Sequence, residues 1–215
     1  MNYLINQLLN SEELEILRKN LDKKDLFWED GKQTAGKHAA EVKNNLQLKR
    51  DVNLSKKFSG LIIKKILNND LIKSFALPKK VHGTMFSKST IGMKYGRHID
   101  NAYMSSGRAD LSFTIFLNCK DKYDGGTLSI ESFNSEEKFK LEAGEIIIYP
   151  STYLHSVEEV IAGERLVFIG WIESYIKSIE EREYLFDLDA AARSLLAKYG
   201  RSNEVDLIFK SYSNL

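Results

Sequence analysis

Apolar and polar positions divide the chain into three blocks that differ in their period. In the first block, up to about Leu77, apolar side chains recur at helical spacing. Leu14, Leu17 and Leu21 form one such stripe, and a longer one runs from about Leu54. This block is therefore predicted to be mostly helical.

Local signals place the ends of the first predicted helix and a break after it. Asn10 or Ser11 can cap the helix, because a short polar side chain there accepts a bond from a free backbone N–H. Residues 31–45 follow no clear period. We expect loop or edge strand in that stretch.

The second block, about 81–173, has the pattern of β-strands. Residues 111–117 are rich in strand-forming side chains, and 127–131 alternate between polar and apolar after a glycine turn. Residues 146–149 end at a proline, and 166–172 are apolar on both faces, which predicts an interior strand. Short strands joined by turns, without helices between them, favour an antiparallel sandwich or barrel.

The third block returns to helical spacing. Residues 185–199 carry one apolar face and are followed by Gly200, a residue typical of helix ends, and 205–212 predict one more short helix. We thus expect one domain over 1–173, with its core at about 81–173, and a small helical domain over 174–215. The fold class is mainly β with flanking helices.

Composition restricts the function and the compartment. Thirty-one Lys and Arg against thirty Asp and Glu give a net charge of +1, so no basic excess points to nucleic acid. No apolar run reaches about 18 residues, which argues against a membrane span. Cys119 is the only cysteine and the start of the chain lacks a signal-peptide pattern, so we expect a cytoplasmic protein without a disulfide.

Three side chains suggest a metal site. His98 and Asp100 are spaced to face the same way in a strand, and His155 would join them from a different strand. Two imidazoles and one carboxylate leave coordination positions open, as ferrous oxygenases require, whereas structural zinc sites close with a fourth protein ligand. The alternative is a pair of surface histidines without a metal.

Arg165 follows His155 and precedes an apolar run. A guanidinium beside a buried strand needs an anion, and a carboxylate fits its two parallel N–H groups. We expect it to open its strand and bind an acidic cosubstrate. The alternative is a salt bridge to one of the nearby acids, Glu158, Glu159 or Glu164.

Other notable residues have simpler interpretations. His38 and His82 lie in polar surroundings and are predicted to be ordinary surface histidines, while Cys119 is predicted to be a packed thiol. Trp171 continues an apolar strand and is assigned to the core. Residues 43–45 are treated as a polar loop that could line the mouth of a site.

The motifs together resemble a known family, the PKHD-type hydroxylases, which are bacterial members of the prolyl-4-hydroxylase-like iron and 2-oxoglutarate dioxygenases. The resemblance covers nearly the whole chain. It is carried by residues 95–100, 123–128, 143–151, 154–155, 165 and 171–172, and outside the β-rich block by 41–45 and 185–189. It implies a double-stranded β-helix (a jelly-roll, or cupin-like fold) with N-terminal helices and a C-terminal helical domain.

The same resemblance implies roles for individual residues. His98, Asp100 and His155 would be the Fe(II) ligands and Arg165 would hold 2-oxoglutarate, with O2 as the oxidant and L-ascorbate (vitamin C) as the iron-reducing helper. One departure concerns Ser89, where many prolyl hydroxylases place a tyrosine that binds the cosubstrate. Three residues could take the place of this tyrosine: Ser112, Thr114 and Tyr95, although Tyr95 is more simply explained by packing.

The expected function is hydroxylation of a C–H bond, with release of succinate and carbon dioxide. The substrate is open between a peptidyl residue of the prolyl type and a small molecule, and the apolar C-terminal helices are compatible with a homodimer. Two rivals remain. A nucleic-acid dealkylating oxygenase usually carries a second arginine where this chain has Trp171, and a non-catalytic metal-binding β-barrel sensor would not consume 2-oxoglutarate.

Overall fold

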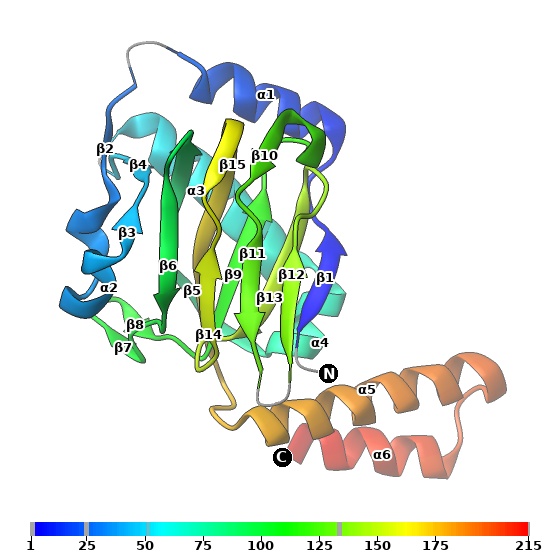
Figure 1. Cartoon of the computed structure of the whole chain (residues 1–215). Helices are drawn as coiled ribbons and strands as arrows, with labels where there is room; N and C mark the ends of the chain where they lie inside the picture. The colour runs from blue at the N-terminus through cyan, green and yellow to red at the C-terminus, as the bar shows by residue number, and fades with distance from the viewer. Residues whose placement is uncertain (1–2, 24–25, 51, 133–134, 215) are drawn as a thin grey trace.

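Two antiparallel β-sheets face each other and form the body of the protein (Figure 1). The computed structural model describes residues 3–23, 26–50, 52–132 and 135–214. The facing sheets and the flanking helices agree with the predicted double-stranded β-helix, a mainly β fold.

The larger sheet has eight strands, seven of which follow the order β1-β13-β9-β15-β5-β4-β2, while β10 pairs with β15. Their bounds are β1 Leu4–Gln7, β2 Trp28–Asp30, β4 Leu46–Leu48, β5 Pro78–Thr90, β9 Leu111–Phe116, β10 Tyr123–Gly125, β13 Glu145–Pro150 and β15 Val160–Ser174. The predicted interior strand is confirmed, because β15 lies between β9 and β5.

The smaller sheet has the order β12-β11-β14-β6-β3. Its strands are β3 Lys43–Asn44, β6 Lys94–His98, β11 Leu128–Glu131, β12 Glu136–Phe139 and β14 Leu154–Val157. A separate two-stranded ribbon pairs β7 Tyr103–Met104 with β8 Gly107–Arg108.

Alternation along the strands of the larger sheet sorts side chains between two environments. In β9, Phe113 and Ile115 point to the helices, in a core that also holds Phe168 of β15. The alternate residue Phe116 belongs to a second core, between the sheets. Because strand neighbours face opposite ways, Ser112 and Thr114 share this inner side. The inner side is therefore apolar at one end and polar at the other.

The helices cover the outer face of the larger sheet. They are α1 Ser11–Leu21, α3 Asn53–Asn68 and α4 Asp70–Ala76. The predicted cap is confirmed in α1: the Asn10 side chain accepts from the Glu13 backbone N–H, and the Glu13 carboxylate accepts from the backbone N–H of Asn10. This reciprocal pair fixes where the helix begins.

The first block is less helical than its spacing predicts. Four short strands, β1 to β4, lie within it and pair with both sheets. The expected loop or edge strand at 31–45 contains a 3₁₀ turn (η1, Gly31–Thr34), the short helix α2 Lys37–Glu41 and β3. Strands of two to four residues are too short to show a period in the sequence. Whether they form depends on pairing with segments far along the chain.

Two helices follow the last strand. They are α5 Ile179–Tyr199 and α6 Asn203–Asn214, and they project together from one end of the sheets (Figure 1). Gly200 ends α5 at φ 76°, and Ser74 of α4 donates to Asp189 of α5 at 2.6 Å, which ties the pair to the body. The homodimer and the domain boundary at 173 stay predictions. Among the described residues, no helix combines the length and apolar character needed to cross a membrane.

Candidate metal and cosubstrate site

A cavity of about 540 Å³ lies between the two sheets and is lined mainly by polar side chains. The smaller sheet contributes His98 and His155, and the larger sheet contributes Ser112, Thr114 and Arg165. The polar residues predicted from sequence for this site therefore line one space.

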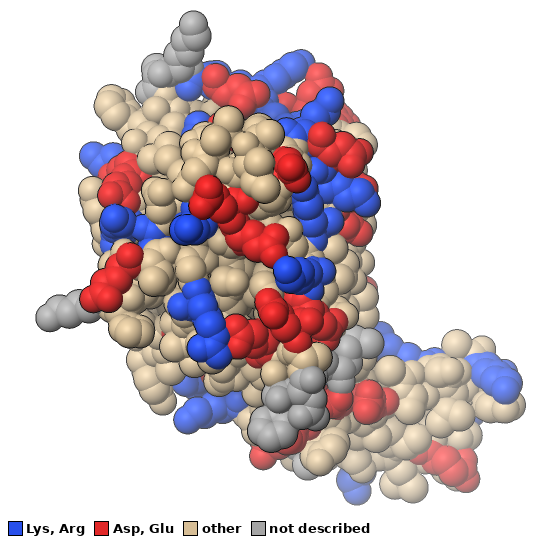
Figure 2. All heavy atoms as spheres, in the orientation of Figure 1, with Lys and Arg blue, Asp and Glu red and all other residues tan. Residues whose placement is uncertain are grey.

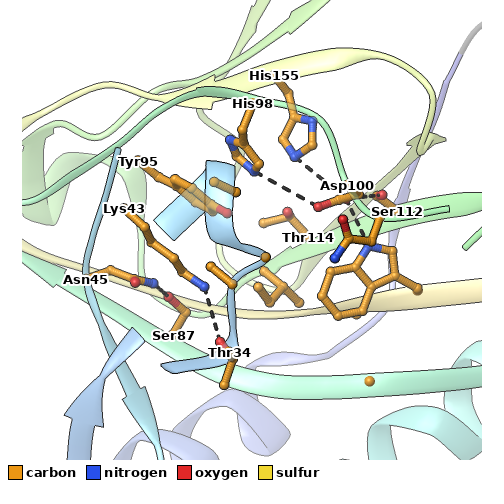
Figure 3. A pocket seen from close by; sticks show the side chains of 18 of the residues that line it. Thr34, Lys43, Asn45, Ser87, Tyr95, His98, Asp100, Ser112, Thr114 and His155 are labelled. Carbon is orange, nitrogen blue, oxygen red and sulfur yellow. Dashed lines mark hydrogen bonds and ion pairs between the residues drawn. The ribbon is translucent and has the colours of Figure 1, made fainter. Parts of the chain in front are cut away.

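His98, Asp100 and His155 come together at one point of the cavity (Figure 3). One ligand atom from each lies within 4.8 Å of the other two. His98 and His155 are direct partners on the adjacent strands β6 and β14, which confirms that the second imidazole comes from a different strand. A divalent ion fits such a donor set, since all three groups offer a lone pair to a common centre.

Hydrogen bonds set the direction of both imidazoles. The Nδ1 atoms of His98 and His155 bond the backbone carbonyls of Gly96 and Tyr153, at 2.8 and 3.0 Å. Each Nδ1 must donate to a carbonyl, so each Nε2 keeps its lone pair free for a metal. These Nε2 atoms lie 4.0 and 3.7 Å from the Asp100 carboxylate oxygens. Burial, with His155 close by, lowers the pKa of His98 to about 4 and favours the neutral, metal-binding form.

Asp100 reaches this point in a way the spacing did not predict. Strand β6 ends at His98, so Asp100 lies beyond it and strand alternation does not orient its side chain. Two side chains of the larger sheet hold the carboxylate instead. Ser112 Oγ donates to Asp100 Oδ2 at 2.6 Å, and Trp171 Nε1 donates to the same oxygen at 2.9 Å.

The assignment of Trp171 to the core is therefore wrong. Its side chain is only partly buried, lines the cavity and bonds Asp100. Close to it, Gly83 has φ 63°, and a Cβ added there would lie 2.6 Å from the indole. A glycine is needed at this position to let the indole approach the backbone.

Arg165 lies inside β15 rather than at its start, because the strand already begins at Val160. It is 3% exposed, and its Nε has no hydrogen-bond partner among the described residues. The salt bridge considered as an alternative does not form: Glu158, Glu159 and Glu164 pair with lysines. A buried guanidinium without a carboxylate partner is costly unless a ligand supplies an anion.

Hydroxyl groups surround Arg165. Tyr149 is 3% exposed, and its ring packs edge-on against His155 at 5.3 Å between centroids. Burial raises its pKa well above the usual value, while Arg165 and a hydrogen bond with Thr114 oppose that rise, so the hydroxyl stays protonated. Ser89, the Cα partner of Arg165 on β5, is buried and lines the cavity. Tyr149 thus offers a hydroxyl donor near Arg165. It was not among the residues considered from sequence as substitutes for the family tyrosine at position 89.

Two further expectations need correction or refinement. His82 is buried, not on the surface, and its ring nitrogens bond Ser106 Oγ at 2.8 Å and the Arg108 carbonyl at 2.7 Å. His38 is exposed, as expected. Tyr95 stacks on His98 with 3.5 Å between ring centroids and a 14° interplanar angle, which fits the simpler of the two expectations for it.

Lys43 and Asn45, from the segment described above as a polar loop that could line the mouth of a site, do line the cavity. Lys43 is 5% exposed and donates from Nζ to Thr34 Oγ1 at 3.2 Å (Figure 3). Asn45 lines the same wall and donates to Ser87 at 2.6 Å. Burial lowers the pKa of Lys43 to about 8, although the Asp100 carboxylate acts in the opposite direction.

Charges on the outer face of the smaller sheet alternate in sign. Figure 2 shows acidic and basic side chains mixed across this face. Arg97 pairs with Glu131 at 2.7 Å and Lys138 with Glu158 at 2.7 Å, so many of these charges neutralise one another. The described residues of this face thus form no continuous basic surface for a phosphate backbone.

Comparison with known proteins agrees with this geometry. Residues 84–173 match the model of the 2OG-Fe(II) oxygenase superfamily. Over all 215 residues, the chain is 75% identical to a PKHD-type hydroxylase of Prochlorococcus marinus strain MIT 9215 and covers 97% of it. A PKHD-type hydroxylase of strain MIT 9303 is 56% identical over the same length and is also covered to 97%.

Solved structures share the fold at low sequence identity. A Pseudomonas putida prolyl-4-hydroxylase aligns with a TM-score of 0.57 at 16% identity, covering 81% of this chain and 94% of that one. A 2OG-Fe(II) oxygenase family oxidoreductase of Burkholderia pseudomallei aligns with a TM-score of 0.60 at 16% identity, covering 79% and 84%. At this identity the structural match supports the double-stranded β-helix alone.

Proposed function

Since this chain belongs to the PKHD-type hydroxylases of the 2OG-Fe(II) oxygenase superfamily, we propose that His98, Asp100 and His155 bind its catalytic iron. Arg165 is proposed to bind 2-oxoglutarate in the same cavity. The observation that carries the proposal is the convergence of two metal-ready imidazoles and a carboxylate in a cavity with a buried guanidinium, whose Nε has no hydrogen-bond partner among the described residues.

Iron(II) bound there would supply the redox chemistry that couples the oxidative decarboxylation of 2-oxoglutarate by O2 to hydroxylation of a C–H bond, yielding succinate and carbon dioxide. The contribution of the protein's own residues is to hold the proposed metal ligands in position. The carbonyls of Gly96 and Tyr153 keep both imidazoles directed at the metal position, while Ser112 and Trp171 do the same for the carboxylate.

Arg165 would bind the distal carboxylate of 2-oxoglutarate through parallel N–H bonds, the geometry its fork favours. Tyr149 is proposed to add a hydroxyl donor beside it, in the role that the tyrosine absent at Ser89 has in many prolyl hydroxylases. Its protonated state suits this role, since only a neutral phenol donates to a carboxylate. Thr114 interacts with the same hydroxyl and is proposed to orient it.

The direct test is turnover. Purified protein supplied with Fe(II), 2-oxoglutarate, O2 and ascorbate is expected to release succinate and carbon dioxide at equal rates, even slowly without a primary substrate. Tight metal binding with no consumption of 2-oxoglutarate would favour the sensor instead. Salt-sensitive binding of alkylated DNA would favour the dealkylating oxygenase.

Three parts of this proposal concern the surroundings of the enzyme. L-ascorbate is proposed to keep the iron reduced between cycles, so turnover should decline faster when it is omitted. The partner is proposed to be a small-molecule or peptidyl substrate, not nucleic acid. A cytoplasmic location also stays a proposal.

Replacing Trp171 by phenylalanine should weaken iron binding while keeping an aromatic ring beside Gly83. The change removes one of two donors to Asp100, and loss of such an outer hydrogen bond typically costs about 10-fold to 100-fold in metal affinity. Anaerobic titration with Fe(II) measures the effect. Trp28→Phe is the matched control, because Trp28 lies outside the cavity against Lys88. Equal iron affinity in the two variants would show that the indole does not orient the carboxylate.

Tyr149→Phe should raise KM for 2-oxoglutarate by about 5-fold, the effect of losing one hydrogen bond of about 1 kcal/mol. Iron affinity should be unchanged, because the ring that packs against His155 is retained. Initial rates of succinate release at varied 2-oxoglutarate provide the measurement. Tyr3→Phe, which loses only a bond to Glu137, is the control. An unaltered KM in Tyr149→Phe would exclude the hydroxyl from cosubstrate binding.

A further inference from the structure

A second cation is buried in the cavity, on a different wall from Arg165. Lys43 comes from β3 of the smaller sheet, whereas Arg165 comes from β15 of the larger one. The only hydrogen bond of the Lys43 ammonium to the described residues goes to Thr34 Oγ1, although the group has three donors. No carboxylate in the described part of the chain forms an ion pair with it.

Neighbouring groups hold the ammonium in place without neutralising it. Thr34 Oγ1, which accepts from Lys43, itself donates to Gln47 Oε1 at 2.5 Å. Nζ of Lys43 also lies 5.0 Å from the centre of the Tyr95 ring. The Gln47 Nε2 behind Thr34 is buried and lacks a partner among the described residues. Burial of a cation with only uncharged contacts is unfavourable, so this arrangement is suited to an incoming anion.

The balance of charge in the cavity points the same way. Its charged lining residues are Asp100 and three cations, namely Lys43, Arg50 and Arg165. Ferrous iron and the doubly negative 2-oxoglutarate cancel each other, and Asp100 cancels Arg165. Lys43 and Arg50 then remain as positive charge for whatever occupies the rest of the cavity.

Lys43 is also close to the proposed metal centre. The ring of Tyr95 stacks on His98, and Figure 3 shows this ring between His98 and the Lys43 side chain. An anionic group bound at Lys43 would therefore leave the remainder of a short molecule in front of the metal ligands. Lys43 is only 5% exposed, so a group that binds it must enter the cavity. The cavity has a volume of about 540 Å³ and must also hold 2-oxoglutarate, so the space left for the substrate is small.

We propose that Lys43 binds a carboxylate of the primary substrate, and that this substrate is a small carboxylic acid and not an uncharged peptide segment. The inference rests on the proposed function, because it assumes that Arg165 and the iron site are occupied by 2-oxoglutarate and metal. The lowered pKa of Lys43, about 8, is consistent with a site that an anion completes, because a bound carboxylate would favour the charged ammonium.

The probe is a small-molecule extract of cultured Prochlorococcus marinus, the organism of the two PKHD-type hydroxylases reported above. The extract is used as prepared and after methyl esterification of its carboxylic acids. Each extract is incubated with enzyme, Fe(II), 2-oxoglutarate and ascorbate. Mass spectrometry then identifies compounds that gain one oxygen atom. The variants are Lys43→Met, which keeps the length of the side chain without its charge, and Lys43→Arg, which keeps the charge.

The wild-type protein is expected to oxygenate a carboxylic acid whose methyl ester is not a substrate. Lys43→Met should form at least about 10-fold less product, because a charge-assisted hydrogen bond contributes about 1.5–3 kcal/mol, and Lys43→Arg should recover part of it. KM for 2-oxoglutarate in Lys43→Met should stay close to the wild-type value, because Arg165 is retained. Lys88→Met is the matched control, since Lys88 also lies over an aromatic ring but outside the cavity.

The outcomes separate the two proposals. No succinate from wild-type protein with iron and 2-oxoglutarate would overturn the proposed function itself. If that turnover is present, the carboxylate proposal is overturned by oxygenation of the esterified compound, by full product formation in Lys43→Met, or by products absent from the small-molecule fraction or confined to proteins.

Discussion

Replacing Asp100 by asparagine is expected to lower the affinity for Fe(II) by more than about 100-fold and to abolish succinate release, because the change removes the negative charge from the three proposed ligands. Asparagine keeps the size of the side chain and an oxygen that can accept from Ser112 and Trp171. The fold should therefore persist, and thermal unfolding should occur near the wild-type temperature. Anaerobic metal titration and a succinate assay measure the effect.

Two controls accompany this prediction. Asp121→Asn removes an exposed carboxylate far from the cavity lining, and His38→Ala removes an exposed imidazole. Both should bind iron like the wild type. His82 is unsuitable as a control, because it is buried and bonded at both ring nitrogens. Wild-type iron binding in Asp100→Asn would remove this carboxylate from the ligand set.

Replacing Arg165 by methionine should raise KM for 2-oxoglutarate by about 30-fold or more. Truncation of one partner of a buried, hydrogen-bonded charge pair typically costs about 2–5 kcal/mol. Fe(II) affinity should change little, since Arg165 is not one of the three converging ligands. Steady-state rates at varied 2-oxoglutarate and a parallel iron titration separate the two effects.

Arg165→Lys should recover only a small part of the loss, because a single ammonium cannot reproduce the parallel N–H pair of the guanidinium. Arg97→Lys is the matched control: Arg97 forms the same kind of paired contact, but with Glu131 on the outer surface. A KM for 2-oxoglutarate in Arg165→Met close to that of Arg97→Lys would mean that another cation, such as Lys43, holds the cosubstrate.

Much of the architecture was predictable because it depends on local periods. The apolar run at 166–172 gave an interior strand, and the Asn10 cap gave the start of α1. The strands β2 and β4 were not predicted as such, since each has only three residues and forms through pairing with other segments of the chain. Sequence alone contains little information about such pairings.

The residues of the candidate site divide in a similar way. His98, His155 and Arg165 were identified by residue type and by their place relative to predicted strands, and the structure brings them into one cavity. Trp171 was assigned to the core, and Lys43 was placed only within a polar loop that could line the mouth of a site. Trp171 lies in an apolar strand, and its sequence context does not show that its N–H bonds the Asp100 carboxylate. Lys43 lies in a polar segment, and its sequence context does not show that folding buries it.

The imidazoles of His98 and His155, which belong to the proposed iron site, are both anchored to backbone carbonyls only two residues earlier in the chain. Such short-range anchoring keeps the donor set ready before any ion arrives, so an ion can leave and another can enter without refolding. A ready-made set of two nitrogens and one oxygen does not itself reject zinc or copper, which bind comparable ligands more tightly than ferrous iron does. Mismetallation is thus the expected mode of inactivation, and the supply of reduced iron, rather than selectivity in the ligands, would determine how much of the enzyme is competent.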